Sequence, residues 1–244
     1  MKSLVIDIET IPASVYTWGL FDQNIGINQV IKPGGVVCWA AKWAGKKKVY
    51  FKSSFHHGHE EMVQAAWDLI DEADALIHFN GRSFDVKHLN REFLLQGMTP
   101  PSPHKDIDLL TATRSRFKFL SNKLQFVSEQ LGLGSKTTHT GFSLWEECMA
   151  GNPKAWALMK KYNIQDVHLT ERLYDRLLPW IKSHPHVALI DGHDGCQNCG
   201  GTDLRPRGFY FTNTGQYQRR RCHGCGTWSR DRSRAGTITT TQIS

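Results

Sequence analysis

Short apolar runs with the length of β-strands occupy the first half of the chain, and turn residues separate them. The first three runs, at residues 3–9, Val36–Trp43 and Lys48–Lys52, together predict a β-meander. Two shorter runs follow at Ala75–Phe79 and Asp106–Leu109, each after a helical pattern. The chain is therefore expected to begin as a sheet and to continue with alternating helices and strands.

Helical periodicity alternates with the later strands and then dominates. Apolar residues share one helical face in the segment Glu60–Glu72. A later segment opens with Asn152 as N-cap and Pro153 at the first helical position. The expected helices cover Glu60–Glu72, Asp85–Gly97, Leu120–Leu131, and Asn152 to about Lys182.

This order of elements predicts an α/β domain over residues 1–182, with a mixed sheet flanked by helices. Residues 183–195 are expected to be a linker, and residues 231–244, rich in Ser, Thr and Arg, a disordered tail. Residues 11–35 are expected to form a long loop. Its aromatic residues either stack on terminal bases or pin the loop onto the domain; they are Tyr16, Trp18 and Phe21.

Charge is distributed unevenly along the chain. The 244 residues carry a net charge of +7, with a pI of about 9.1. From Cys196 onward there are eight Arg, no Lys and two acids, which gives +6, so the rest of the chain carries +1. This balance favours a polyanionic partner of the C-terminal part. We expect no membrane span, because no apolar run of 18 residues occurs.

Two carboxylates, Asp7 and Glu9, interrupt the first apolar run. Residues two apart on a strand point to the same face, so the two acids lie side by side. Two adjacent negative charges at the end of an apolar strand cost stability unless a cation lies between them, and a divalent metal is the usual solution. The alternative is a strand end with two solvated acids.

Two further segments offer acids that could complete such a site. Asp85 follows a strand and a turn and would begin a helix, where an aspartate also serves as a cap. Tyr162 and Asp166 are four residues apart in a helical segment and therefore share one face. The alternative for this pair is a core tyrosine beside a surface aspartate.

Asp7-Ile8-Glu9, then Asn80 through Asp85, then Tyr162-x-x-x-Asp166, resemble the three exonuclease motifs of the DEDD superfamily in its Tyr-containing subgroup. The resemblance covers roughly residues 1–180, and motif order and spacing agree. It is closest to stand-alone exonucleases of the DnaQ-like and YprB-like groups, including versions in phage genomes. It implies a ribonuclease H-like fold and 3′–5′ exonuclease activity.

The resemblance also implies residue roles. Two Mg²⁺ or Mn²⁺ ions would be held by four acids, and hard oxygen ligands suit both metals; the acids are Asp7, Glu9, Asp85 and Asp166. Tyr162 would position the attacking water, since its unperturbed pKa of about 10 makes it a weak base. Asp108 is a reserve candidate near the site. Asn80 and Phe84 are expected to shape the substrate pocket, although Phe84 could instead pack in the core.

Four cysteines form a C-x2-C-x22-C-x2-C set, and Gly follows each pair at once. This spacing predicts a tetrahedral structural zinc site in a zinc ribbon over residues 196–230, held by Cys196, Cys199, Cys222 and Cys225. Disulfides and an iron–sulfur cluster are the competitors, and the lack of a secretion signal argues for a reducing cytosol. Cys38 and Cys148 are expected to be buried free thiols.

Basic and aromatic residues interleave between the two cysteine pairs. Phe209–Phe211 and Tyr217–Arg221 predict a hairpin around Thr212–Gly215. We expect Arg219, Arg220 and Arg221 to contact nucleic acid, whereas the alternative is a protein-docking module whose arginines keep it soluble.

The sequence therefore predicts a metal-dependent 3′–5′ exonuclease that releases nucleoside 5′-monophosphates, with DNA, especially single-stranded 3′ ends, as the favoured substrate. The rivals are a structure-selective endonuclease and an inactive nucleic-acid-binding scaffold on the same fold. Replication or repair proteins are candidate partners. The expected location is the cytoplasm of a bacterial or phage-infected cell.

Overall fold

The computed structural model of the protein describes residues 1–135 and 141–237. The chain divides into two compact units: residues 2–173 form the larger one, and Met1 with the chain from Tyr174 onward forms the smaller one. The boundary falls inside the helix α7 (Pro153–Leu177), upstream of the domain end expected at residue 182. Within the described residues, no helix is both long and apolar enough to cross a membrane.

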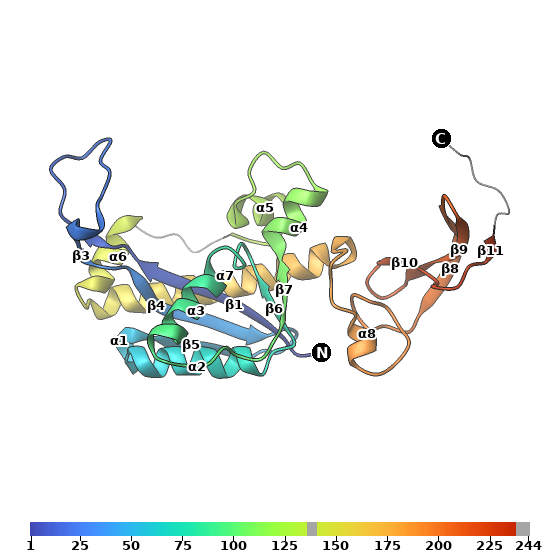
Figure 1. Ribbon diagram of the computed structural model, residues 1–244, viewed down its shortest axis with the longest axis horizontal. Coiled ribbons are helices and arrows are strands. Elements are labelled where there is room, and N and C mark those ends of the chain that lie inside the picture. The colour runs from blue at the N-terminus through green and yellow to red at the C-terminus, as the bar shows by residue number, and fades with distance from the viewer. Residues whose placement is uncertain (136–140, 238–244) are drawn as a thin grey trace. The chain divides into compact units, whose positions relative to one another are not determined.

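A five-stranded mixed sheet forms the centre of the larger unit, in the order β5-β4-β1-β6-β7 (Figure 1). The central strand pairs antiparallel with β4 and parallel with β6, while β4–β5 is antiparallel and β6–β7 is parallel. The predicted meander and mixed sheet are thus confirmed. The strands are β1 (Ser3–Ile11), β4 (Gly35–Trp43), β5 (Val49–Ser53), β6 (Ala75–His78) and β7 (Lys105–Asp108).

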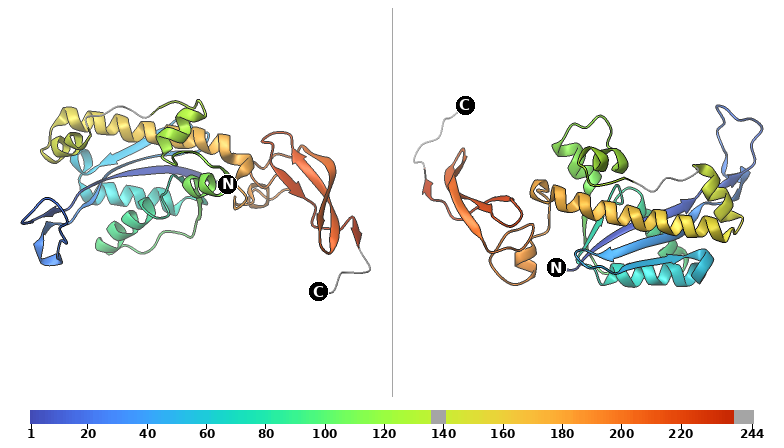
Figure 2. Two further views of the ribbon diagram at one scale, coloured as in Figure 1. Left: turned by 90° about the horizontal axis from the view of Figure 1, so that it is seen from above. Right: turned by 180° about the vertical axis from the view of Figure 1, so that it is seen from behind.

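Helices cover both faces of this sheet, with α2 on one side and α7 on the other (Figure 2). The helix expected at 120–131 is shorter, and three helices were not predicted, α1, α4 and α6. The helices are α1 (Ser54–His57), α2 (His59–Asp71), α3 (Asp85–Leu95), α4 (Leu109–Arg116), α5 (Leu124–Gln130), α6 (Phe142–Met149) and α7.

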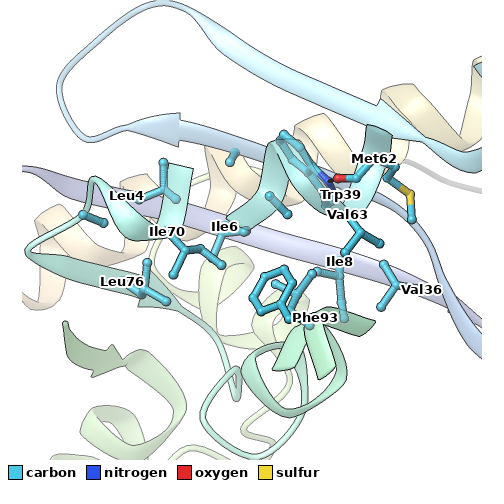
Figure 3. Packing of buried hydrophobic residues seen from close by; sticks show 14 residues of the cluster. Leu4, Ile6, Ile8, Val36, Trp39, Met62, Val63, Ile70, Leu76 and Phe93 are labelled. Carbon is cyan, nitrogen blue, oxygen red and sulfur yellow. Dashed lines mark hydrogen bonds between the residues drawn. The ribbon is translucent and has the colours of Figure 1, made fainter. Parts of the chain in front are cut away.

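The alternation of β1 separates its two faces. Leu4, Ile6 and Ile8 point into a buried core formed with α2 and α3, where Met62 and Phe93 pack against them (Figure 3). Each of these side chains is at most 4% exposed, so burial of this face anchors the register of the strand. The odd-numbered side chains of β1, including both acids, consequently point toward the opposite face of the sheet.

Residues 11–35 include short regular elements instead of forming only a loop. They are β2 (Ser14–Val15), the 3-10 helix η1 (Ile27–Gln29) and β3 (Val30–Lys32), with β2 paired to β3. Trp18 is fully exposed, and Tyr16 and Phe21 are 72% and 82% exposed. Because the three rings are in solvent, they do not pin this segment onto the domain.

The smaller unit contains a four-stranded antiparallel sheet in which β9 pairs with the other three strands. The expected linker 183–195 contains α8, whose Ala188 is fully buried. Residues 231–237, expected to be disordered, contain β11, and 238–244 lie outside the described residues. The elements are η2 (Leu178–Trp180), α8 (Val187–Ile190), β8 (Leu204–Thr212), β9 (Gly215–Cys222), β10 (Trp228–Arg230) and β11 (Gly236–Thr237).

Candidate active site and cysteine cluster

Asp7 and Glu9 lie on the same face of β1, as their alternation predicts, and opposite the buried cluster of Leu4, Ile6 and Ile8. Glu9 pairs with Cys38 of β4, and the register then skips Val37, which forms a β-bulge beside the acids. Burial, reinforced by the charges of Glu9 and Asp7, raises the pKa of the Cys38 thiol. The acids therefore lie next to a neutral, buried group, and the charge of the pair is not offset from that side.

Asp166 of α7 joins these two acids. One carboxylate oxygen from each of Asp7, Glu9 and Asp166 lies within 4.8 Å of the other two. Two oxygens on one Mg²⁺ are at most about 4.2 Å apart, because each lies about 2.1 Å from the ion. The three side chains thus need little movement to share one divalent cation, and an all-carboxylate donor set suits a hard metal such as Mg²⁺ or Mn²⁺.

Asp85 lies beside this group of three acids but outside it. It is the first residue of α3, is 4% exposed, and accepts a hydrogen bond of 3.1 Å from the backbone N–H of Ile8. Burial raises the pKa of the Asp85 carboxyl to about 6, against the lowering effects of His78 and of the Ile8 N–H. In a buried acid that resists ionisation, a nearby cation strongly stabilises the ionised carboxylate.

Asn163 is a site residue that the sequence analysis missed. Its amide Nδ2 donates to Oδ2 of Asp7 at 2.7 Å and to the backbone oxygen of Asp7 at 3.2 Å. The side chain is fully buried, so it holds Asp7 in one orientation. The signal was its spacing, since Asn163 and Asp166 are three residues apart on α7 and share a face.

Tyr162 belongs to the same helix face and is 8% exposed. Its ring contacts Trp145 edge-on, with centroids 6.3 Å apart, and Trp145 donates to the backbone oxygen of Thr10 at 3.1 Å. These contacts fix the ring next to the carboxylates. Tyr162 is thus a buried core residue that also lines a cleft, whereas Asp166 is buried and is not a surface aspartate.

A cleft of about 670 Å³ opens beside the acids, and Asp7, Tyr162 and Asn80 are among its lining residues. Its opposite wall comes from α4, α5 and the segment between them, and includes Arg114 and Lys123. The cleft therefore combines the carboxylate of Asp7 with the cationic side chains of Arg114 and Lys123. Sequence reasoning did not single out these two cations, because it did not predict α4.

The turn that begins at Asn80 and precedes Asp85 is hydrogen-bonded to the end of β7. Asn80 has a left-handed backbone with φ of 71°, and its N–H donates to Oδ1 of Asp108 at 3.2 Å. The same oxygen accepts from the N–H groups of Leu110 and Thr111 at 2.9 and 3.2 Å, which makes Asp108 the N-cap of α4. Asp108 thus has a structural role in this arrangement.

Phe84 and His78 also flank this turn. Phe84 is 39% exposed, and its ring lies 4.6 Å from that of His88, so it does not pack in the core. His78 is fully buried and accepts from the N–H of Gly81 at 3.1 Å, while its other ring nitrogen lies 3.0 Å from Asp106. A Cβ at Gly81 would come within 2.4 Å of the His78 ring, so only glycine fits there.

The four cysteines of the smaller unit converge as their spacing predicts. The sulfurs of Cys196 and Cys225 are 3.6 Å apart, as are those of Cys199 and Cys222. Sulfurs on a tetrahedral zinc are about 3.8 Å apart, because each Zn–S bond is about 2.3 Å. Burial raises the pKa of the Cys196 and Cys199 thiols, so the anionic form that binds zinc needs the cation beside it. The donor set therefore fits a structural zinc.

The two cysteine pairs form equivalent turns. Gly200 and Gly226 have φ of 75° and 84°, which explains why glycine follows each pair. The N–H of Gly200 donates to the oxygen of Cys196 at 2.9 Å, and that of Gly226 to Cys222 at 3.0 Å. Cys38 and Cys148, by contrast, are buried free thiols, as expected.

The three consecutive arginines of β9 do not form one surface. Residues 219 and 221 share a face, and Arg220 points to the other. There Arg220 makes two hydrogen bonds with Asp231, at 2.6 and 2.9 Å. The guanidinium groups of Arg219 and Arg221 lie instead near the ring of Trp228.

The fold and the site define an α/β protein with an acidic centre beside a mixed five-stranded sheet. Residues 5–178 match the RNase_H_2 family model, described as RNase H superfamily. The chain belongs to the RNase H superfamily.

Among solved structures, the chain is similar to the family B DNA polymerase from the hyperthermophilic archaeon Pyrobaculum calidifontis, with a TM-score of 0.53 and 17% sequence identity. The similarity covers 73% of this chain and 24% of the polymerase, so the chain spans about a quarter of that protein's length. At this identity the likeness concerns the fold. No match was found among curated proteins.

Proposed function

We propose that this protein is a metal-dependent nuclease, and more narrowly a 3′–5′ exonuclease that releases nucleoside 5′-monophosphates. The observation that carries the proposal is the convergence of Asp7, Glu9 and Asp166 within 4.8 Å, on a fold of the RNase H superfamily. The direction, the product and membership of the Tyr-containing DEDD subgroup come from the resemblance of the three motifs. Single-stranded DNA is the favoured substrate.

The carboxylates would hold the divalent cations, with Asp85 completing the set from the start of α3. When bound, these cations lower the pKa of a water and offset the charge of the phosphate that it attacks. Asn163 keeps Asp7 oriented through its 2.7 Å hydrogen bond, which fixes part of the donor set in advance. Arg114 and Lys123, across the cleft, supply positive charge for the remaining phosphates.

In the hydrolysis, a bond forms between the water oxygen and phosphorus, and the bond from phosphorus to the 3′ oxygen of the preceding nucleotide breaks. The water loses its proton to solvent, and the leaving 3′ oxygen gains one. Tyr162 is placed to orient the attacking water, because its ring is fixed beside the acids and lines the cleft. Its ordinary pKa of about 10 suits an orienting role better than that of a base.

The deciding experiment uses single-stranded DNA and RNA labelled at the 5′ end, with Mg²⁺ or Mn²⁺. Stepwise shortening of the labelled strand, with release of mononucleotides, supports the proposal. Internal cuts would favour the endonuclease, and binding without cleavage would favour the scaffold. Asp7→Ala should abolish cleavage, whereas Asp68→Ala, an exposed aspartate on α2, should keep it. Substantial activity in Asp7→Ala would contradict the site assignment.

A further inference from the structure

One face of the small sheet carries alternating arginines and aromatic rings. Trp228 of β10 pairs with Arg221 of β9, and Arg230 pairs with Arg219. The guanidinium of Arg219 lies 4.7 Å from the centroid of the Trp228 ring, and that of Arg221 lies 5.9 Å away. Both distances fall within cation–π range, so these three side chains lie on the same side of the sheet.

Arg230 extends the arrangement across β9 to β8. Its guanidinium lies 4.0 Å from the ring of Tyr217 and 5.1 Å from that of Tyr210, and these two tyrosines are cross-strand partners. We call the set the Arg–aromatic face; it consists of Tyr210, Tyr217, Arg219, Arg221, Trp228 and Arg230.

The positive charge of this face is not neutralised by the acids of the module. Asp203 pairs at 3.0 Å with Arg205, which lies beside Arg221 as its cross-strand partner, and Asp231 pairs at 2.6 Å with Arg220 on the opposite side of the sheet. Within the described residues, no carboxylate forms an ion pair with Arg219, Arg221 or Arg230. The face therefore attracts a polyanion.

The rings remain accessible between the guanidinium groups. Tyr210 and Trp228 are 49% and 50% exposed, so each offers surface on which a flat group can stack. Bases of a single strand stack on exposed aromatic and guanidinium planes, whereas the bases of a duplex are already stacked on one another. A single strand offers both a row of phosphates for the arginines and unstacked bases for the rings.

We propose that the Arg–aromatic face binds single-stranded nucleic acid, with bases stacked on Trp228 and Tyr210 and phosphates held by Arg219, Arg221 and Arg230. This goes beyond the nuclease proposal, because the face contains none of the acidic residues and binds a strand whether or not the protein cleaves it. Arg220 has a different role: its pairing with Asp231 stabilises the opposite side of the sheet.

The test measures binding of a short fluorescent oligothymidylate and its RNA counterpart over a range of salt concentrations. It uses the full zinc-loaded chain carrying Asp7→Asn, without added Mg²⁺, so that cleavage does not interfere. Arg219→Gln and Arg230→Gln should each weaken binding several-fold and reduce the slope of log affinity against log salt by about 0.7, the value for one phosphate contact on a single strand. Trp228→Ala should weaken binding about fivefold or more with little change in that slope.

The matched control is Arg232→Gln, which removes the same charge from an exposed position beside Asp231. It should have a smaller effect than either variant of the face, and all variants should keep the zinc content and melting behaviour of the parent. The proposal is overturned if Arg219→Gln and Arg230→Gln match Arg232→Gln in affinity and slope. It is also overturned if the chain binds a blunt duplex as tightly as a single strand, or binds neither.

Discussion

The backbone N–H of Ile8 donates a hydrogen bond of 3.1 Å to the carboxylate of Asp85. Ile8 stands between Asp7 and Glu9 on β1, at a point where β6 no longer pairs with this edge of the strand, because their pairing ends at Val5. The bond therefore ties the first turn of α3 to the strand that carries the two acids. This contact gives the Ile8 N–H a hydrogen-bond partner and positions the Asp85 carboxylate beside the strand.

This contact leads to a prediction about Asp85→Asn, a variant that retains the acceptor oxygen but not the charge. Burial raises the pKa of Asp85 from 3.8 to about 6. The folded, metal-free protein therefore binds more protons than the unfolded chain between these values, and it loses stability as pH rises through that window. Asp85→Asn should be more stable than the parent at pH about 7.5, by on the order of 3 kcal/mol, with no difference near pH 4.

The measurement is urea unfolding in metal-depleted buffer without a chelator, so that zinc stays bound. Adding Mg²⁺ should stabilise the parent and do less for Asp85→Asn, because ligand binding to the folded state adds stability. A parent protein that is the more stable of the two at neutral pH without Mg²⁺ would contradict the assignment of Asp85 as a buried, metal-seeking acid.

Period-two alternation was sufficient to predict that Asp7 and Glu9 share one face of the strand, because residues two apart on a strand point to the same side. The same alternation places Arg220 on the opposite face of β9 from Arg219 and Arg221. The number of basic residues in the segment does not by itself reveal this separation. Asn163 was harder to predict, because its role depends on α7 crossing β1 at Asp7, which is a tertiary contact. The sequence carries no strong periodicity for α4, so the cationic wall of the cleft could not be predicted either.

Asn163→Ala should weaken binding of Mn²⁺ by about 10- to 100-fold, the usual effect of removing a group that orients a metal ligand. The reason is the loss of the two hydrogen bonds, 2.7 and 3.2 Å, that hold the side chain and backbone of Asp7. The measurement is Mn²⁺ titration followed by calorimetry, together with the Mg²⁺ dependence of the cleavage rate.

Asn152→Ala is the matched control, since Asn152 caps the start of the same helix through a 3.0 Å bond to the N–H of Lys154. It should cost about 1 kcal/mol of stability and leave Mn²⁺ affinity unchanged. Equal losses of Mn²⁺ affinity in both variants would mean that Asn163 acts only through the stability of α7.

Asp108 allows a third prediction, because one oxygen of its side chain accepts from three backbone N–H groups. Asp108→Ala should lower the free energy of unfolding by about 1–2 kcal/mol, and Asp108→Asn by less, because asparagine also caps helices. Neither variant should change Mn²⁺ affinity when it is measured under conditions in which the protein is fully folded. If Asp108→Ala lost Mn²⁺ binding without losing stability, Asp108 would be a metal ligand and not a cap.

The cysteine cluster yields the last prediction. Cys199→Ser should reduce zinc from about one ion per chain to none, because a structural site needs all four thiolates. Folding of a small metal module is coupled to its metal, so residues 196–237 should become sensitive to protease in this variant. The larger unit has its own buried core around β1, so its melting transition should persist.

Cys148→Ala, which removes a buried thiol outside the cluster, should keep the zinc and the protease resistance of the module. Zinc loss is measured by metal analysis and protease sensitivity by limited proteolysis. A Cys199→Ser protein that keeps its zinc and its resistant C-terminal fragment would show that the module folds without a four-thiolate site.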